Sequence, residues 1–253
     1  MKRLKKRIFA GAVCEQIVFN VSDRTVNIRQ AKPRLRFKNE KERQLHRTLI
    51  SRRNHARRFH ANFSTTSLYS TLTFDDENEI FTFSEGRQLR DLFFRKLKRK
   101  YPDAVIFIYM GRGKATHRIH FHMVTEGIPK EFIQEKWTYG SVIRISNLRA
   151  HNYYDKKDHG KDYTGLANYL FDHWTPEQGG HRWKMSKNAR KAEVENTQEA
   201  KRDYTVEKPP RAPKGYILVE AQANQYGYLY FKYIVAPEPV TRKRQQQTGP
   251  PAG

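Results

Sequence analysis

The chain is poor in cysteine and has no long apolar run. Cys14 is the one cysteine among 253 residues, which excludes an intramolecular disulfide and a cysteine-based zinc finger. A bound metal would therefore need histidine, carboxylate or water ligands. No apolar run approaches the roughly 20 residues of a membrane span, and the run after the basic N-terminus is too short for a signal peptide. We expect a cytoplasmic protein without a membrane segment.

Acidic residues are also scarce. The 26 Asp and Glu stand against 49 Lys and Arg, which gives a formal net charge of +23. So one-sided a charge repels itself unless a polyanion balances it, and nucleic acid is the favoured partner. Residues 1–60 alone hold 18 basic and four acidic side chains. With 37% hydrophobic and 13% aromatic residues, the chain is able to fold around a core.

The most basic segment, residues 39–63, has the pattern of an amphipathic helix. Its apolar residues recur at near-helical spacing and comprise Leu45, Leu49, Ile50, Ala56, Phe59 and Phe63. We predict DNA-backbone contacts from its arginines Arg52, Arg53, Arg57 and Arg58. The alternative is a solvated helix that packs its apolar stripe on the core.

From residue 68 onwards the periodicity alternates between strand and helix. In chain order we predict strands at 68–76 and 79–84, a helix at 85–102 capped by Ser84, strands at 104–110 and 117–126, a helix at 129–137, a strand at 140–148, a helix at 163–174 and a strand pair within 214–234. This order predicts an α+β fold, with a central antiparallel sheet and helices packed on it. We expect a basic N-terminal extension (1–66), one main domain (67–235) and a disordered tail (236–253).

Two histidines, His120 and His122, flank Phe121 in the predicted strand at 117–126. Because side chains alternate along a strand, both imidazoles face the same way. Two converging neutral imidazoles can bind a divalent cation, and they can equally be hydrogen-bonding histidines on a solvated sheet face.

Four motifs occur in order: "TLTF" (71–74), "RIHFH" (118–122), "GLANYL" (165–170) and "HRWKMSKNARKAEV" (181–194). As an ordered set they resemble the bacterial rolling-circle replication initiators of plasmids and phages. These belong to the HUH endonuclease superfamily, named for histidine, hydrophobic residue, histidine. The resemblance covers Leu68 to Val194, and it implies that residues 67–235 form an HUH endonuclease domain.

The resemblance implies a site-specific enzyme that nicks one strand of origin DNA and later rejoins it. His120 and His122 match the metal-binding pair, and Tyr169 matches the nucleophilic tyrosine. A phenol, with a reference pKa of about 10, is a poor nucleophile at neutral pH unless a cation neutralises the phosphate it attacks. Attack would leave a 5′-phosphotyrosine and a 3′-hydroxyl that a polymerase can extend.

The cofactor implied is Mg²⁺ or Mn²⁺, and the partners are single- and double-stranded origin DNA in the cytoplasm of a bacterial host. The turn "GRGKAT" (111–116) joins two strands, so it is not a phosphate-binding loop, and no other segment of the sequence fits that pattern. We therefore expect a host helicase, together with a host polymerase.

The third metal ligand is open. Relatives commonly supply a carboxylate on the strand before the histidine pair, but "VIFIYMGRGKAT" (105–116) has no acidic residue. The candidates are water and the side chains of Asp75, Asp172 and His173, because nearby His117 points to the opposite face from His120 if the strand already starts there. Asp172 itself departs from the family, since many relatives have a lysine there. The reserve nucleophiles are Tyr163 and the loop residues Tyr153 and Tyr154.

Further DNA contacts are predicted around the motifs. The basic candidates are Arg112, Lys114, Arg118, Arg182 and Lys187. Trp183 either stacks on an unpaired base or closes the core against a helix. Two other functions stay open: an HUH transposase or relaxase with the same chemistry, and a non-catalytic nucleic-acid-binding module with structural histidines.

Overall fold

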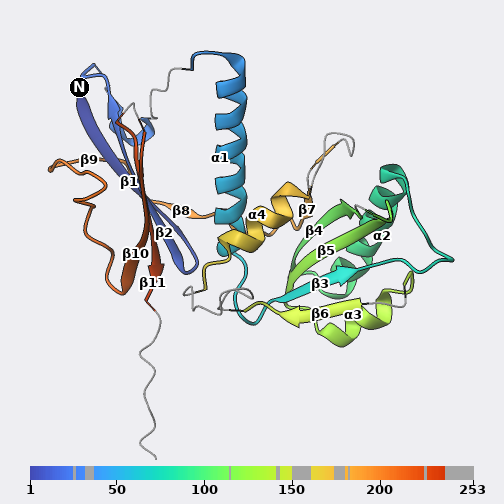
Figure 1. Ribbon diagram of the computed structural model, residues 1–253. Helices are drawn as coiled ribbons and strands as arrows, with labels where there is room; N and C mark the ends of the chain where they lie inside the picture. Colours follow the sequence, from blue (N-terminus) through green and yellow to red (C-terminus); the bar gives the residue numbers. More distant parts are fainter. Residues whose placement is uncertain are drawn as a thin grey trace, which may run out of the picture.

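Two antiparallel β-sheets, separated by helices, make up the fold (Figure 1). This is a computed structural model that describes residues 1–24, 27–31, 37–113, 115–140, 143–149, 161–173, 180–181, 183–224 and 227–236. The predicted α+β class is confirmed. The prediction of one central sheet is wrong, because the N-terminal strands pair with the last strands of the chain to form a second sheet.

One of the two sheets, sheet B, contains the histidine pair. Its five strands run in the order β6 (Ile143–Asn147), β3 (Leu68–Leu72), β5 (Ile119–Glu126), β4 (Val105–Arg112) and β7 (Trp183–Met185). In this register His122 lies between Thr71 on β3 and Tyr109 on β4. These three side chains therefore share one face of the sheet.

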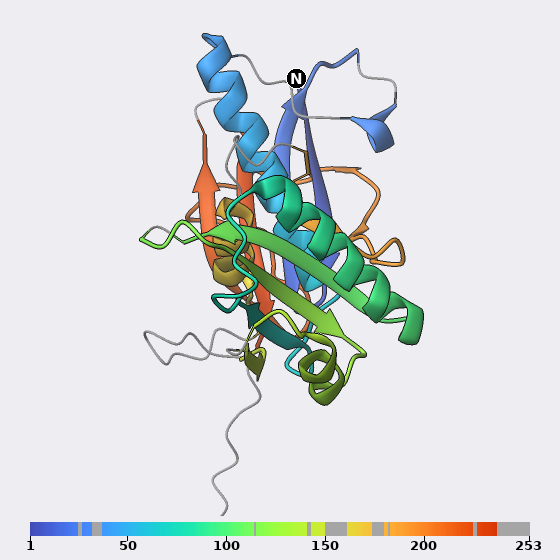
Figure 2. The ribbon, with the colours of Figure 1, turned by 90° about the vertical axis from the view of Figure 1, so that its right-hand side faces the viewer.

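The opposite face of sheet B is apolar and is covered by α2 (Phe83–Lys100) and α3 (Lys130–Lys136). Figure 2 shows α2 crossing this face in front of the sheet. Met110, Phe121 and Met123 point into the core beneath these helices. Because Phe121 and Met123 alternate with the histidines along β5, the core face and the histidine face are built from the same strand.

The start of α2 differs from the prediction. Thr82, not Ser84, is the N-cap, and its hydroxyl accepts a hydrogen bond from the backbone N–H of Glu85. The segment 79–84 contains no strand, because its last two residues already belong to the helix. The predicted short strand there is wrong.

The histidine face of sheet B is covered in part by α1 (Glu40–His60) and α4 (Thr164–Asp172). Ala56 and Phe59 on α1, together with Phe63, are buried against this face. The first half of the helix does not follow the predicted stripe, since Leu45 and Leu49 are 63% and 45% exposed. The predicted amphipathic helix therefore packs on the core only through its C-terminal half.

The second sheet, sheet A, joins the two ends of the described chain. Its strands are β10 (Tyr216–Ala223), β11 (Leu229–Val235), β2 (Val13–Val21), β1 (Lys2–Ala10) and β8 (Glu193–Val194), with β9 (Gln198–Glu199) also paired to β1. A short 3-10 helix, η1 (Ile28–Gln30), follows β2. The sequence prediction contained no strands in residues 1–21, and its boundary at residues 66 and 67 separates β2 from its partner β11.

The turn between β1 and β2 lies against the end of α1. Gly11 in this turn has φ +55°, and a Cβ there would lie 2.2 Å from the carbonyl oxygen of His60. Only glycine meets both demands. Sheet A, α1 and the histidine face of sheet B are thereby packed in series (Figure 1).

The remaining predictions concern segments at the margin of the described structure. The loop tyrosines Tyr153 and Tyr154 and the tail beyond Ala236 lie outside the described residues. Among the described helices, none combines the length and the apolar character needed to cross a membrane.

Candidate metal centre

Three histidines converge on one face of sheet B. His120 and His122 come from β5, and His173 immediately follows α4. One ring nitrogen of each lies within 4.8 Å of the others. His173 was one of the predicted candidates for the third ligand, and it is the one that the fold brings to the pair.

Hydrogen bonds orient two of these rings. His122 Nδ1 lies 2.7 Å from the hydroxyl of Tyr69, and His173 Nδ1 lies 2.8 Å from the carbonyl oxygen of Tyr169. A carbonyl only accepts, so Nδ1 of His173 carries the proton and its Nε2 is left with a lone pair. Second partners of this kind commonly fix the tautomer of a metal-binding histidine.

His122 Nε2 is the clearest sign of a missing ligand. It is buried and has no hydrogen-bond partner among the described residues. Buried polar nitrogens are normally satisfied, because an unpaired one costs about 1–3 kcal/mol. A metal ion between the three rings would satisfy it, so the residues fit a cation.

The electrostatics favour the neutral form of the two histidines on β5. Burial, followed by the neighbouring His173 and His120, lowers the pKa of His122 to about 3. Burial and His173 also lower the pKa of His120, against an opposing hydrogen bond with the backbone of Arg118. Neutral imidazole is the form that binds metal ions.

Gly111 provides room for the rings. It pairs with His120 across β4 and β5. A Cβ at this position would lie 2.6 Å from His120 Nε2 and 2.9 Å from Cδ2 of His173. Any other residue would therefore push on two of the three candidate ligands.

The other candidate ligands are engaged elsewhere. The Asp75 carboxylate accepts a hydrogen bond of 3.0 Å from the backbone N–H of Asn78, and Asp172 forms an ion pair with Arg52. His117 is exposed, in the turn before β5, with φ +56°. None of these three belongs to the histidine cluster.

Tyr169, the predicted nucleophile, lies beside the cluster. Its ring centroid is 4.2 Å from that of His173 and 5.7 Å from that of His122, and the side chain is 49% exposed. Tyr169 and His173 are four residues apart, so they share one face of the helical turn. Tyr163, a predicted reserve, is 5% exposed and packs on His60, which places its ring in the core.

The four predicted DNA-binding arginines of α1 have different surroundings. Arg52 pairs with Asp172, and the guanidinium of Arg53 lies 4.0 Å from the ring centroid of Tyr230. Arg57 is 14% exposed and donates a hydrogen bond of 2.9 Å to buried Glu15. Arg57 therefore holds α1 against sheet A, whereas Arg58 reaches the sulfur of Met185 at 3.6 Å.

The other predicted DNA contacts lie on or near sheet B. Arg112 donates a 2.6 Å hydrogen bond to the carbonyl of Phe81, and Arg118 pairs with Asp76 and Glu79. Lys187 is exposed. Lys114 and Arg182 fall outside the described residues.

Trp183 is half-buried on β7, and its ring centroid is 4.4 Å from that of His55. It therefore packs against α1.

Sequence reasoning missed Tyr69 and Gly111. Tyr69 lies in the alternating pattern "LYSTL", which predicted only that it belongs to a strand. Its role depends on the pairing of β3 with β5, and that of Gly111 on the pairing of β4 with β5. No local signal in the sequence gives this register.

No family model matches the chain, and no curated protein or solved structure is significantly similar to it.

Proposed function

We propose that this protein is a metal-dependent endonuclease of the HUH type, which nicks one strand of replication-origin DNA and remains attached to it through Tyr169. One observation carries the proposal: an exposed tyrosine lies beside three converging histidines, one of which has an unsatisfied buried nitrogen. The net charge of +23 provides the attraction to DNA.

The residues in and around the cluster have different roles. His120, His122 and His173 would hold a divalent cation, which when bound neutralises the scissile phosphate and stabilises charge in the transition state. Imidazole donors bind transition-metal ions more readily than Mg²⁺, which prefers oxygen. The carbonyl of Tyr169 accepts a hydrogen bond from Nδ1 of His173, and the hydroxyl of Tyr69 contacts Nδ1 of His122, so both rings are oriented with Nε2 available as the ligand atom.

Tyr169 supplies the nucleophile. Its oxygen forms a bond to phosphorus while the bond from phosphorus to the 3′ oxygen breaks. The phenolic proton goes to solvent, and the leaving 3′ oxygen takes a proton from water. The phosphotyrosine bond conserves the energy of the phosphodiester, so attack by a 3′-hydroxyl rejoins the strand without a nucleotide cofactor.

The rolling-circle assignment depends on the order of the motifs. A transposase or relaxase of the same superfamily would perform the same covalent step on different DNA, such as a transposon end or a transfer origin. A nucleic-acid-binding module would use the basic surface without forming a covalent bond.

The decisive experiment is a covalent-adduct assay. Single-stranded segments tiling the DNA around the gene, labelled at the 3′ end, are incubated with protein and Mn²⁺ and run on a denaturing gel. We expect a labelled protein band from wild type and none from Tyr169→Phe.

The matched control is Tyr163→Phe, which removes a hydroxyl from the buried tyrosine at the N-cap of the same helix. It should form the adduct normally. An adduct from Tyr169→Phe would reassign the nucleophile, and binding without any adduct in Mn²⁺ or Mg²⁺ would favour the non-catalytic module.

A further inference from the structure

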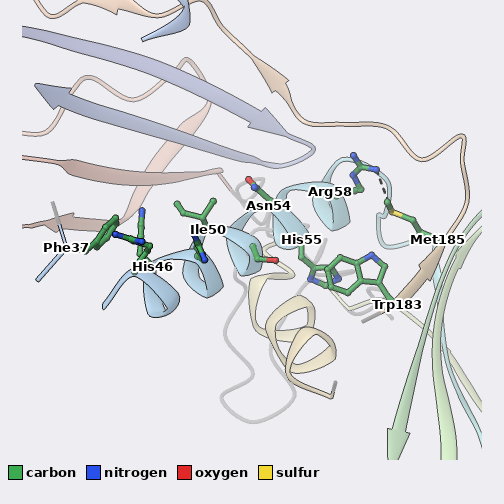
Figure 3. Close-up of a pocket in the computed structure, with 11 residues that line it drawn as sticks. Phe37, His46, Ile50, Asn54, His55, Arg58, Trp183 and Met185 are labelled. Atoms are coloured by element: carbon green, nitrogen blue, oxygen red, sulfur yellow. Dashed lines mark hydrogen bonds between the residues drawn. The ribbon is translucent and has the colours of Figure 1, made fainter. Parts of the chain in front are cut away.

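A groove of about 780 Å³ runs along most of α1 and ends at β7 (Figure 3). It lies outside the histidine cluster, and the mechanism above does not use it. Its wall on α1 includes Arg43, Arg47 and Arg58, and no aspartate or glutamate lines it. The nearest carboxylate partner is Glu40, which is exposed and contacts Arg43 and Arg47 at 3.0 and 3.6 Å. The groove therefore suits an anionic ligand.

The groove also has flat rings at both ends. Phe37 and His46 lie together at one end, with centroids 5.2 Å apart and planes tilted by 35°. Trp183 and His55 lie at the other end, as Figure 3 shows. Ile50 lies on the helix between the two ends of the groove. Cationic side chains interleaved with flat rings are the surface on which unpaired bases stack while their phosphates are neutralised.

The groove ends next to the helix of the proposed nucleophile. Trp183 has its ring centroid 5.7 Å from that of Phe171, two residues beyond Tyr169 on α4. Arg52, the neighbour of groove residue Ser51, pairs with Asp172 just before His173. Between Arg43 and Arg58 the helix rises about 22 Å, enough for a few nucleotides.

We propose that this groove binds unpaired bases of single-stranded DNA, and that these bases belong to the strand adjoining the phosphate attacked by Tyr169. The link to the phosphate attacked by Tyr169 rests on the proposed function, whereas the binding of single-stranded DNA does not. A duplex would present only phosphates to the arginines, because its bases are already stacked and cannot enter between the rings. The aromatic ends therefore favour a single strand.

The test measures fluorescence anisotropy with labelled dT15 and with a labelled 15-base-pair duplex, at fixed salt and without metal, so that no nicking occurs. His46→Ala combined with Arg47→Ala should weaken dT15 binding about 10-fold, by loss of one stacking ring and one phosphate contact. Duplex binding should fall by no more than about 3-fold.

Two variants control for charge and for folding. Arg99→Ala removes an exposed cation at the end of α2, away from the groove, and should change dT15 binding by less than about 2-fold. Trp183→Phe keeps an aromatic ring at the inner end and should weaken dT15 binding less than the double variant does. Thermal unfolding of each variant identifies any loss that comes from misfolding.

A cross-linking experiment places the DNA directly. Oligonucleotides of 15 residues carrying 5-iodouracil are irradiated with Tyr169→Phe protein, and peptides are mapped by mass spectrometry. We expect cross-links at Phe37, His46 or Trp183.

Several outcomes overturn the inference. The first is an equal loss of affinity for dT15 and for duplex in the double variant. The second is tighter binding of labelled rU15, measured in the same way, than of dT15. The third is a set of cross-links that avoid the groove in a folded protein. Adduct formation by wild type with no groove cross-link would contradict DNA binding in the groove and support the nuclease activity. Groove cross-links without any adduct would contradict the nuclease activity and support the single-strand binding site.

Discussion

Sheets A and B both place polar side chains against the helices between them, and they differ in whether those side chains have partners. On sheet A, buried Glu15 pairs with Arg57, and buried Lys232 pairs with Asp162 at 2.5 Å. On sheet B, His122 Nε2 is buried without a hydrogen-bond partner in the described chain. The paired groups stabilise the packing, whereas the unpaired nitrogen of His122 lies among converging imidazoles that could bind a cation.

The partners on sheet A also serve the site on sheet B. Lys232 contacts both Asp162 and Thr164, and the carboxylate of Asp162 accepts a hydrogen bond of 3.0 Å from the backbone N–H of Thr164. These contacts fix the first turn of α4, and the same helix ends at His173. Sheet A therefore positions the third histidine without contacting it.

The largest effect on metal binding is expected from His120→Ala. Loss of one of three ligands should weaken Mn²⁺ binding at least about 100-fold, by calorimetry, and abolish nicking. The matched variant Met123→Ala lies on the opposite face of β5. It should reduce the free energy of unfolding by about 2–5 kcal/mol and leave Mn²⁺ affinity nearly unchanged. Equal Mn²⁺ affinities for the two variants would contradict the separation of the faces.

Gly111→Ala should have the next largest effect, although it keeps all three ligands. Its methyl group would meet His120 Nε2 at 2.6 Å, so the rings must move apart, and we expect Mn²⁺ binding to weaken about 10- to 100-fold. The control is Gly165→Ala on α4, where a Cβ meets nothing within 4 Å. Unchanged Mn²⁺ affinity in Gly111→Ala would show that the rings do not need this space.

Tyr69→Phe removes one hydroxyl and keeps the ring stacked on His122. Without the hydrogen bond of 2.7 Å to Nδ1, the ring of His122 is less firmly oriented, and Mn²⁺ binding should weaken about 10-fold. Tyr109→Phe is the matched control, since the Tyr109 hydroxyl bonds to His55 and not to the cluster. It should lower stability by about 1–3 kcal/mol and leave Mn²⁺ binding intact. Equal Mn²⁺ affinities in the two variants would remove Tyr69 from the site.

Asp162→Asn should change stability but hardly affect Mn²⁺ binding. Burial raises the pKa of Asp162, but the hydrogen bond with His60 and the charge of Lys232 outweigh it and hold the pKa below its usual range. Asparagine can still accept the hydrogen bond from Thr164 but leaves Lys232 buried without a counter-charge. We expect a loss of about 3 kcal/mol in the free energy of unfolding at pH 7, measured by urea titration.

The pH dependence gives a second check on Asp162. Because the folded pKa is depressed, this carboxylate stabilises the fold fully above the ordinary carboxyl pKa, and the contribution is lost as the pH falls through the folded pKa. The stability difference between wild type and Asp162→Asn should be constant from pH 7 down to about pH 5 and shrink in more acidic solution. A difference that grows on acidification would contradict the charged pair.

Local patterns predicted most of the elements correctly. The helices α3 and α4 and the strands β4, β5, β6, β10 and β11 lie where periodicity placed them. The start of α2 was misplaced because Thr82 and Ser84 are both good caps, and their choice depends on where Phe83 packs. β1 was missed because its basic residues hide the alternation of buried Leu4 and Ile8, and β2 was missed because it is buried on nearly every residue and shows no alternation of polar and apolar side chains.

By itself, the sequence determined what depends on neighbours along the chain. A strand period of two puts His120 and His122 on one face, and a helical period puts Tyr169 and His173 on one face. Only the tertiary structure decided that these two faces meet, that Tyr69 and Gly111 flank the histidines, and that β2 pairs with β11. The reason is that periodicity is a property of a few adjacent residues. Register and helix docking are set instead by contacts between residues far apart in the chain, and no short pattern records them.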